Sequence, residues 1–398
     1  MTLPTLPVIR LRPNANTRAI RRGAPWVFAN ETVLDRRTKA LAPGTIAVLE
    51  DAERAPLAMV AVNPASKIIA RILGPADAPV PDVDWFVARL KRALDLRIRL
   101  FDAPFYRLVH AEADGLPGVI IDRFGDTCVI QPNAAWADLL LDELAEALVR
   151  VTGVTCVLKS SGGRGRQLEG LDDVNAVLRG SAPDAAVPVE MNGATYMADL
   201  TSGQKTGLFY DQRPNHAMAA RLCHDARVLD VFSHVGGFAL AGLAGGAASA
   251  LAVDASAPAL ALAAEAAERM GASDRFATRR GDAFETLAAL ATEAERFDVV
   301  ICDPPAFAPS KPTLEAGLRA YERIARLSAA LVVEGGYLVL CSCSHAADLE
   351  KFTGACLRGI GRAGRRPVLL HTGFAGPDHP QLPQLIESGY LKALVFRL

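Results

Sequence analysis

The chain has 398 residues, of which 51% are hydrophobic and 22% are charged. This balance is typical of a folded globular protein of two or three domains, and it excludes a disordered or low-complexity chain. The net charge of −1 excludes a protein that is basic throughout, and the seven scattered cysteines lack the paired spacing of a zinc site or a disulfide framework.

The first 74 residues are basic and contain short apolar segments. They carry 11 Lys and Arg against five Asp and Glu. Apolar stretches at 8–11, 45–49, 57–62 and 68–72, separated by Pro, Gly and Asn, predict a small β-barrel domain over 1–74. Cations around an aromatic ring are typical of RNA contact, although Trp26 alone is more simply explained as a core residue. The residues assigned to RNA binding here are Arg12, Arg18, Arg21, Arg22, Trp26, Lys67 and Arg71.

A linker with three prolines at 74–84 separates this domain from a mixed segment. Apolar residues at a spacing of four predict a helix over 85–100. A hairpin of 119–121 and 127–130, a helix over 136–151 and a strand over 154–158 follow. We interpret 75–190 as a small α+β domain, in which Arg164 and Arg166 are expected to contact RNA from a glycine-containing loop.

Residues 191–398 alternate strand and helix. Strands are predicted at 228–232, 250–253, 275–279, 299–302 and 337–341, each followed by a helical pattern. This alternation predicts an α/β domain with a doubly wound, Rossmann-like parallel sheet. Such sheets bind ligands at the carboxyl ends of their strands, so the residues that follow each strand are the candidate site.

Acidic residues and paired glycines follow these strands. Asp230 precedes Gly236 and Gly237, Asp254 ends the second strand, and Asp282 follows the third. A carboxylate at this place accepts hydrogen bonds from a ribose diol, whereas an acid that caps a helix is the simpler explanation for any one of them. A dinucleotide is the first rival ligand, but the G-x-G-x-x-G fingerprint is absent.

The pattern resembles the S-adenosylmethionine site of class I methyltransferases. The resemblance implies that Asp254 holds the ribose, that Asp282 lies near the adenine amine, and that the loop 230–238 surrounds the methionine moiety. The residues expected to bind the cofactor are Asp211, Gln212, Arg213, Asp230, Phe232, Ser233, Gly236, Gly237, Phe238, Asp254, Ala255, Ser256, Asp282 and Ala283.

Two further strings follow the fourth and fifth strands. The first holds an acid, two rigid prolines and an aromatic ring, which suits a clamp on a flat base; its residues are Asp303, Pro304, Pro305, Ala306 and Phe307. The second places Cys343 past the end of a strand, whereas Cys341 is expected in the core. Pyrimidine carbon-5 methylation needs a thiolate that attacks carbon 6, so Cys343 is the candidate nucleophile.

Long strings of the chain resemble one family, the bacterial 23S ribosomal RNA cytosine-5 methyltransferases with an N-terminal PUA domain. They are 22–28, 63–66, 114–125, 203–207 and 211–213, followed by the glycine loop, Asp-Pro-Pro and Cys-Ser. The resemblance implies a PUA domain, a small α+β domain and a class I methyltransferase domain over 191–398. It also implies that Cys343 is the nucleophile, that Asp303 binds and protonates the pyrimidine, and that 211–213 lie near the cofactor or target base.

The sequence departs from that family at two places. Ala306 stands where many relatives have Lys, and no Cys follows the prolines to assist product release, because Cys302 precedes Asp303 and is expected to point to the other face. The residue that removes the carbon-5 proton is therefore unassigned.

Two alternatives stay open. The Asp-Pro-Pro motif also suits methylation of an exocyclic amine, on guanine N2 or adenine N6, and a non-catalytic RNA-binding assembly factor is a rival of another class. The expected partner is large-subunit ribosomal RNA, with a homodimer left open and with no metal and no membrane. The N-terminus lacks a basic segment followed by an apolar run, so we expect a cytoplasmic location.

Overall fold

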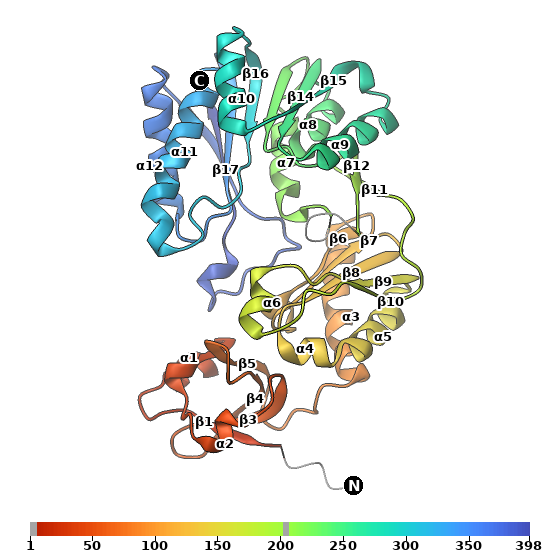
Figure 1. Cartoon of the computed structure of the whole chain (residues 1–398), viewed down its shortest axis with the longest axis vertical. Coiled ribbons are helices and arrows are strands. Elements are labelled where there is room, and N and C mark those ends of the chain that lie inside the picture. Colours follow the sequence, from red (N-terminus) through yellow and green to blue (C-terminus); the bar gives the residue numbers. More distant parts are fainter. Residues whose placement is uncertain (1–5, 202–206) are drawn as a thin grey trace. The chain divides into compact units, whose positions relative to one another are not determined.

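The computed structural model describes residues 6–201 and 207–398, and these fall into two compact units. The first unit contains the described chain up to Asp184 and the later segment Pro377–Ser388. The second contains Ala185–Asp199, Gly207–Gly376 and Gly389–Leu398. Figure 1 colours the chain along its sequence. Residues 203–206 of the string at 203–207 lie outside the described residues.

The N-terminal part of the first unit is a curved β-sheet, red in Figure 1. Its strand order is β1-β3-β4-β5-β2, with β1 parallel to β3 and the other pairs antiparallel. Apolar side chains at alternate positions, among them Ile9, Val60 and Ile69, form its core. The strands are β1 (Val8–Arg10), β2 (Trp26–Phe28), β3 (Thr45–Glu50), β4 (Pro56–Val62) and β5 (Ile68–Gly74), and the helices are α1 (Thr17–Arg21) and α2 (Arg36–Lys39). The sequence predicts these strands except the three-residue β2.

The rest of the first unit is the expected α+β domain, with the strand order β10-β9-β8-β7-β6. The rings of Trp85, Phe86 and Trp136 pack together in its core at centroid distances of 5.3 to 6.0 Å. The strands are β6 (Phe105–His110), β7 (Val119–Phe124), β8 (Thr127–Pro132), β9 (Cys156–Lys159) and β10 (Ala176–Arg179). The helices are α3 (Val83–Leu100), α4 (Ala135–Leu139), α5 (Leu141–Thr152) and α6 (Arg164–Glu169). The single helix predicted over 136–151 is thus two helices, because the chain breaks at Leu140.

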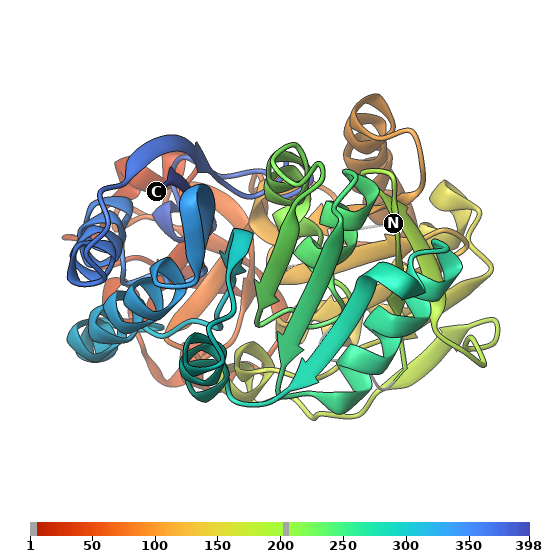
Figure 2. The ribbon, with the colours of Figure 1, turned by 90° about the horizontal axis from the view of Figure 1, so that it is seen from above.

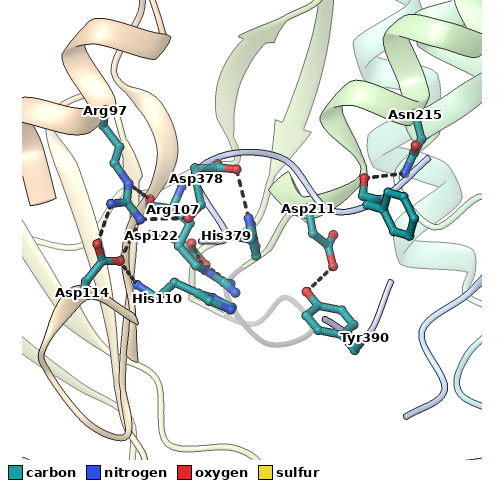
Figure 3. A network of polar contacts seen from close by, with 11 residues as sticks. Arg97, Arg107, His110, Asp114, Asp122, Asp211, Asn215, Asp378, His379 and Tyr390 are labelled. Carbon is teal, nitrogen blue, oxygen red and sulfur yellow. Dashed lines mark hydrogen bonds and ion pairs between the residues drawn. The ribbon is translucent and has the colours of Figure 1, made fainter. Parts of the chain in front are cut away.

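The late segment Pro377–Ser388 is held in the first unit by buried polar contacts. Asp378 is fully buried; its carbonyl accepts a hydrogen bond from Arg97 at 2.9 Å, and its carboxylate accepts one from the backbone N–H of Arg107 at 3.1 Å (Figure 3). Arg97 is itself paired with Asp114 at 2.7 Å. Since the buried charge of Arg97 is compensated by Asp114 and the same side chain bonds Asp378, this network ties sequence-distant segments together.

The second unit is built on a mixed sheet. In the described part of the chain its strand order is β15-β14-β13-β16-β17-β19-β18. The strands are β13 (Arg227–Val231), β14 (Ser249–Asp254), β15 (Phe276–Arg280), β16 (Phe297–Cys302), β17 (Val332–Ser342), β18 (Val368–Gly373) and β19 (Lys392–Arg397). The helices are α7 (Arg213–Ala220), α8 (Gly237–Ala244), α9 (Ala257–Arg269), α10 (Ala283–Thr292), α11 (Leu314–Ala329) and α12 (Leu349–Arg362).

The order of these strands reverses beside β13. From β13 the chain proceeds to β14 and β15 on one side, and it then returns to β16 and β17 on the other. Figure 2 shows β13, β14 and β15 as neighbouring parallel arrows, green to teal. This parallel part confirms the predicted doubly wound sheet. The antiparallel strand β19, which lies between β17 and β18, was not predicted.

A hairpin of β11 (Val187–Met191) and β12 (Ala194–Ala198) also belongs to the second unit. It contacts α8 and α9 through β12, which is why the second unit begins at Ala185, ahead of the expected boundary at 190. Among the described residues, no helix is long and apolar enough to cross a membrane. No group of acidic, His and Cys side chains in these residues could hold a metal ion.

Candidate active site

The site residues predicted in the second unit gather at one edge of its sheet. Asp230 is the penultimate residue of β13, and Asp254 ends β14. Asp282 lies two residues beyond β15, while Asp303 and Cys343 directly follow β16 and β17. These strands are parallel, so their carboxyl ends share an edge, beside the point where the strand order reverses.

Asp230 is fully buried and organises the loop that follows β13. Its Oδ2 accepts hydrogen bonds from the hydroxyl of Ser233 at 2.9 Å and from the backbone N–H groups of Phe238 at 3.2 Å and Ala239 at 2.9 Å. The last two donors lie in the first turn of α8, where helical N–H groups have no partner within the helix. Burial raises the pKa of Asp230 to about 6. The Asp230 carboxylate therefore fixes the backbone of the glycine loop through these hydrogen bonds.

The loop itself is strained. Phe232, His234 and Gly236 all have positive φ angles, of 62°, 50° and 84°. A left-handed conformation costs a residue other than glycine roughly 1–2 kcal/mol, so the surrounding contacts must hold it. One of these is a hydrogen bond from the His234 N–H to Asp254 Oδ2 at 2.9 Å. Such strain is common where a backbone is shaped around a ligand.

Gly237 is required by close packing. A Cβ atom at this position would lie 2.9 Å from Nε2 of His216, which is buried beneath it. The hydroxyl of Tyr196 donates a hydrogen bond to the Gly237 carbonyl at 3.2 Å. Burial lowers the pKa of His216 to about 3, so this imidazole is neutral. The second glycine of the loop thus lets α8 begin directly against a buried ring.

Asp254 and Asp282 both accept backbone hydrogen bonds. Asp254 Oδ1 accepts from the N–H of Ser256 at 2.8 Å, and Asp282 Oδ1 caps α10 through the N–H groups of Phe284 at 2.9 Å and Glu285 at 3.1 Å. The helix-cap explanation therefore holds for Asp282. Each carboxylate oxygen has two lone pairs, so these caps leave acceptor capacity for a ligand.

The carboxylates at this edge of the sheet fit S-adenosylmethionine. Asp254 is partly exposed at the end of β14, where its carboxylate can accept hydrogen bonds from a ribose diol. Asp230 Oδ1 is buried and has no hydrogen-bond partner in the described ranges, so this loop contains an acceptor atom without a donor. Ala255 and Ser256 are exposed beside Asp254, and Ala283 is buried at the start of α10.

Asp303 is the acid with the most perturbed environment at this edge. Burial and the negative charge of Asp211 raise its pKa to about 8, while the side chain of Gln212 opposes the shift. Asp211 accepts a hydrogen bond from the hydroxyl of Tyr390 at 2.6 Å (Figure 3). A carboxyl group with such a pKa is mostly protonated at neutral pH and can donate a hydrogen bond or a proton.

Cys343 is the one partly exposed thiol among the described residues. Of the seven cysteines, all of which lie in the described ranges, the other six are buried. The Sγ atom of Cys343 lies 4.0 Å from the carbonyl oxygen of Pro304, the neighbour of Asp303. As expected, Cys341 is in the core, and Cys302 points away, because its thiol contacts Ser328 at 3.0 Å. The thiol and the protonated acid therefore belong to adjacent strand ends.

A buried hydroxyl network, which the sequence analysis missed, joins the two loops. Ser344 Oγ accepts a hydrogen bond from the backbone N–H of Ala308 at 2.9 Å and contacts the hydroxyl of Tyr321 at 2.7 Å. Ser342 donates to the same Tyr321 hydroxyl at 2.8 Å. The serines on either side of Cys343 thus fix it against the loop that contains Asp303. In the sequence, the two serines on either side of Cys343 were the signal that could have indicated this network.

Phe307 lies in an aromatic cluster. Its ring centroid is 5.1 Å from that of Tyr321, 6.0 Å from Phe284 and 6.2 Å from Phe232. The ring is partly exposed, and Pro305 is exposed beside it. Arg213, by contrast, lies over the ring of Tyr210 at 5.5 Å, at the start of α7.

The cations predicted to bind RNA divide into two groups in the first unit. The exposed group lies on or near α1 and β5. Its members are Arg12, Arg18, Arg21, Arg22 and Lys67. Among them, exposed Arg21 forms an ion pair with the buried Asp51 at 3.4 Å. The side chain of Arg164 lies outside the described residues.

The other group serves internal contacts, and we correct its assignment. Arg71 pairs with Glu112 at 3.0 Å and Glu169 at 3.1 Å, and Trp26 donates its indole N–H to Glu112 at 2.8 Å. Arg166 is fully buried and pairs with Asp138 and Asp172. Because these side chains are engaged in contacts inside the protein and Arg166 is fully buried, we leave Arg71, Trp26 and Arg166 out of the RNA surface proposed below.

Comparison with known proteins agrees with this arrangement. Residues 152–397 match the family described as S-adenosylmethionine-dependent methyltransferase, and residues 9–75 match a PUA-like domain. Ribosomal RNA large subunit methyltransferase I of Alteromonas mediterranea is 35% identical over 389 residues, which cover 97% of both chains. The protein of the same name from Vibrio cholerae is 33% identical over 387 residues, covering 96% of this chain and 97% of the relative.

Solved structures show the same fold. A methyltransferase structure, SMU.776, complexed with S-adenosylhomocysteine superposes with a TM-score of 0.83 at 19% identity, covering 99% of this chain and all of the other. A chain from Streptococcus mutans, described as an S-adenosylmethionine-dependent methyltransferase, gives a TM-score of 0.81 at 20% identity over 99% of this chain. With its class I fold, its PUA-like domain and close relatives along nearly its whole length, the chain belongs to the ribosomal RNA large subunit methyltransferase I family of S-adenosylmethionine-dependent methyltransferases.

Proposed function

We propose that this enzyme methylates carbon 5 of a cytosine in 23S ribosomal RNA through a covalent adduct with Cys343. The observation that carries the proposal is the placement of a partly exposed thiol 4.0 Å from the Pro304 carbonyl, next to an acid whose pKa is raised to about 8. Carbon-5 methylation of a pyrimidine needs this pair, a nucleophile and a proton donor. The names of the relatives support large-subunit ribosomal RNA as the substrate.

The cofactor residues support the same site. Asp254 would hold the ribose hydroxyls, Asp282 and the N-terminus of α10 would contact the adenine, and the loop from Phe232 to Phe238 would enclose the methionine moiety. Asp211, Gln212 and Arg213 would lie close to the cofactor or the target base. When bound, the cofactor supplies an electrophilic methyl group on a sulfonium.

The residues of the chain carry the remaining steps. The Cys343 thiolate forms a bond to carbon 6 of cytosine, and the electron pair of the 5,6 double bond moves toward carbon 5. Protonated Asp303 donates its proton to ring nitrogen 3, which neutralises the negative charge that would develop on the ring, and it takes this proton back when the Cys343–carbon 6 bond breaks. After carbon 5 has accepted the methyl group, its proton leaves to a base, the Cys343–carbon 6 bond breaks, and the thiolate is restored. Phe307, Pro304 and Pro305 would limit movement of the base.

The exposed cations of the first unit are the proposed RNA-binding surface. Arg18, Arg21 and Arg22 lie on or directly after α1, with Arg12 and Lys67 on neighbouring segments. These side chains are exposed and offer guanidinium and ammonium groups for phosphate.

An adduct experiment tests the proposal. The purified full-length protein and its Cys343→Ala variant are incubated with S-adenosylmethionine and a 23S RNA fragment that contains 5-fluorocytidine. The fluorine cannot leave as a proton does, so a carbon-5 mechanism leaves protein and RNA joined. We expect a denaturant-resistant adduct with the wild-type protein and none with Cys343→Ala. Cys223→Ala, which changes a buried cysteine three residues after α7, is the matched control and should still form the adduct.

Other outcomes separate the alternatives. Methyl transfer by both Cys343→Ala and the wild type, without any adduct, would contradict the thiol mechanism and favour methylation of an exocyclic amine. Failure to bind S-adenosylmethionine in calorimetry would favour the non-catalytic assembly factor.

A further inference from the structure

A buried lysine contacts the loop that follows Cys343. Lys392 is the first residue of β19 and pairs in register with Ser342 of β17, one residue before the thiol. Its side chain is 5% exposed. The ammonium donates hydrogen bonds to the carbonyl oxygens of Ser344 at 2.8 Å and Ala347 at 2.7 Å. The cation is thus bound to the residue that immediately follows Cys343.

This ammonium is buried without an ion pair to a carboxylate of the described residues. Asp348, the acid in the same loop, pairs with the exposed Lys351. A buried charge that is compensated by carbonyl dipoles alone is costly, and burial lowers the pKa of Lys392 accordingly. The negative charges of Cys343 and Asp348 act in the opposite direction and favour the ammonium.

We propose that Lys392 is a positioning residue for the reaction, which holds the 343–347 loop and stabilises the thiolate form of Cys343. The proposal rests on the proposed function. An ammonium has three N–H groups, and two are used by the carbonyls of Ser344 and Ala347. A positive charge this close to the loop favours a thiolate over a thiol. Neutral Asp303 adds no opposing negative charge at neutral pH.

A clamp without an electrostatic role is the alternative. In that case Lys392 would matter because its two hydrogen bonds fix the loop, and any side chain that kept them would suffice. The two roles differ in their dependence on charge, and the pH dependence of the thiol reports charge directly.

The experiment measures alkylation of Cys343 by iodoacetamide between pH 5 and 10, in the full-length protein without RNA or cofactor. Mass spectrometry of the Cys343 peptide gives the rate at each pH, and the other six cysteines are buried. The variants are Lys392→Arg, which keeps the charge, Lys392→Gln, which keeps hydrogen-bond donors without charge, and Lys392→Met. Lys351→Met, which changes an exposed lysine of the neighbouring helix, is the matched control.

We expect Lys392→Gln and Lys392→Met to move the midpoint of the alkylation profile upward by about one pH unit, because tenfold less thiolate corresponds to one pKa unit. The rate at pH 7 should fall about tenfold. Lys392→Arg and Lys351→Met should keep the wild-type midpoint. A loop that merely loosens would change the limiting rate at high pH and leave the midpoint in place.

An unchanged midpoint in folded Lys392→Gln would overturn the proposal. Folding is checked by circular dichroism, and the Arg and Gln variants give the comparison if Met destabilises the sheet. The assay does not involve RNA, so its failure is distinct from failure of the proposed function. If Cys343→Ala retains methyl transfer, the carbon-5 mechanism fails whatever the alkylation profile shows.

Discussion

At the scale of single residues, Asp303 has the property that the proposed chemistry requires. Its carboxyl group follows β16, and burial together with the charge of Asp211 raises its pKa to about 8. Two acids at neighbouring positions do not both ionise readily, so one retains its proton.

Replacing Asp303 by Asn should reduce kcat/KM for RNA methylation by about 10²–10⁴, the usual contribution of a positioned proton donor. The wild-type rate should fall as the pH rises through about 8, because the protonated form is lost there. Asp303→Asn should lack this decline. Measurement of kcat/KM between pH 6 and 9.5 checks both effects, with Glu315→Gln, an exposed acid of α11, as the control. Equal pH profiles for Asp303→Asn and the wild type would contradict the acid role.

The same substitution has a separate consequence for stability. The folded carboxyl titrates at about 8 and the ordinary value is 3.8, so between these pH values the folded state retains a proton that the unfolded state releases. Stability should therefore decline as the pH rises across this window. The pH dependence of unfolding should be flatter in Asp303→Asn.

At the scale of elements, the start of α8 depends on one acid. Asp230 accepts three hydrogen bonds on Oδ2, two of them from the first turn of the helix. The helix has no polar residue of its own to cap it, since it begins at Gly237. The strained loop before α8 is held by the same carboxylate, which accepts the hydrogen bond from the hydroxyl of Ser233.

Asp230→Ala should lower the free energy of unfolding by about 1–3 kcal/mol, because it leaves buried donors without an acceptor. It should also weaken S-adenosylmethionine binding, since the loop backbone is no longer fixed. Asp230→Asn retains an acceptor oxygen and should stay close to the wild type in stability. Urea unfolding and titration calorimetry measure the two effects. If Asp230→Ala bound the cofactor as the wild type does, the loop would not depend on this cap.

The parallel strands and the residues at their ends could be predicted, because buried parallel strands appear as apolar runs between helical patterns. The strands β18 and β19 could not, since β18 is largely exposed and β19 carries a lysine within its apolar run. The hydroxyl network of Ser342, Tyr321 and Ser344 also escaped prediction. Ser342 and Ser344 are 21 and 23 residues from Tyr321 in the sequence, and only the fold brings the three side chains together.

The basic N-terminal sequence shows a second limit of prediction from sequence. Composition locates cations but does not distinguish those that face solvent from those that pair inside the protein. Arg71 and Trp26 looked like RNA contacts, yet both are bound by acids of the α+β domain. Those acids lie far along the chain, so the pairing is a property of the folded unit.

At the scale of the whole molecule, one acid joins the two domains of the first unit. Glu169, at the end of α6, is 5% exposed. Its carboxylate accepts hydrogen bonds from Asn63 at 2.9 Å, Ser66 at 3.0 Å and Arg71 at 3.1 Å, all of which belong to the PUA-like domain. The linker at 74–84 is therefore supported by a buried polar contact between the domains.

Glu169→Ala should lower the free energy of unfolding of the first unit by about 1–3 kcal/mol, because it removes the carboxylate acceptor of two buried polar side chains and one of the two acidic partners of Arg71. Glu53→Ala, which removes an exposed acid of the PUA-like domain, should change it by no more than about 0.5 kcal/mol. Urea unfolding measures the loss, and limited digestion with proteinase K should cut the linker at 74–84 faster in Glu169→Ala. Arg71 retains Glu112 as a partner across the same junction, so its charge stays compensated and the PUA-like sheet itself should not unfold when the junction loosens. Cleavage within β3–β5 instead of the linker would mean that Glu169 stabilises the sheet rather than the junction.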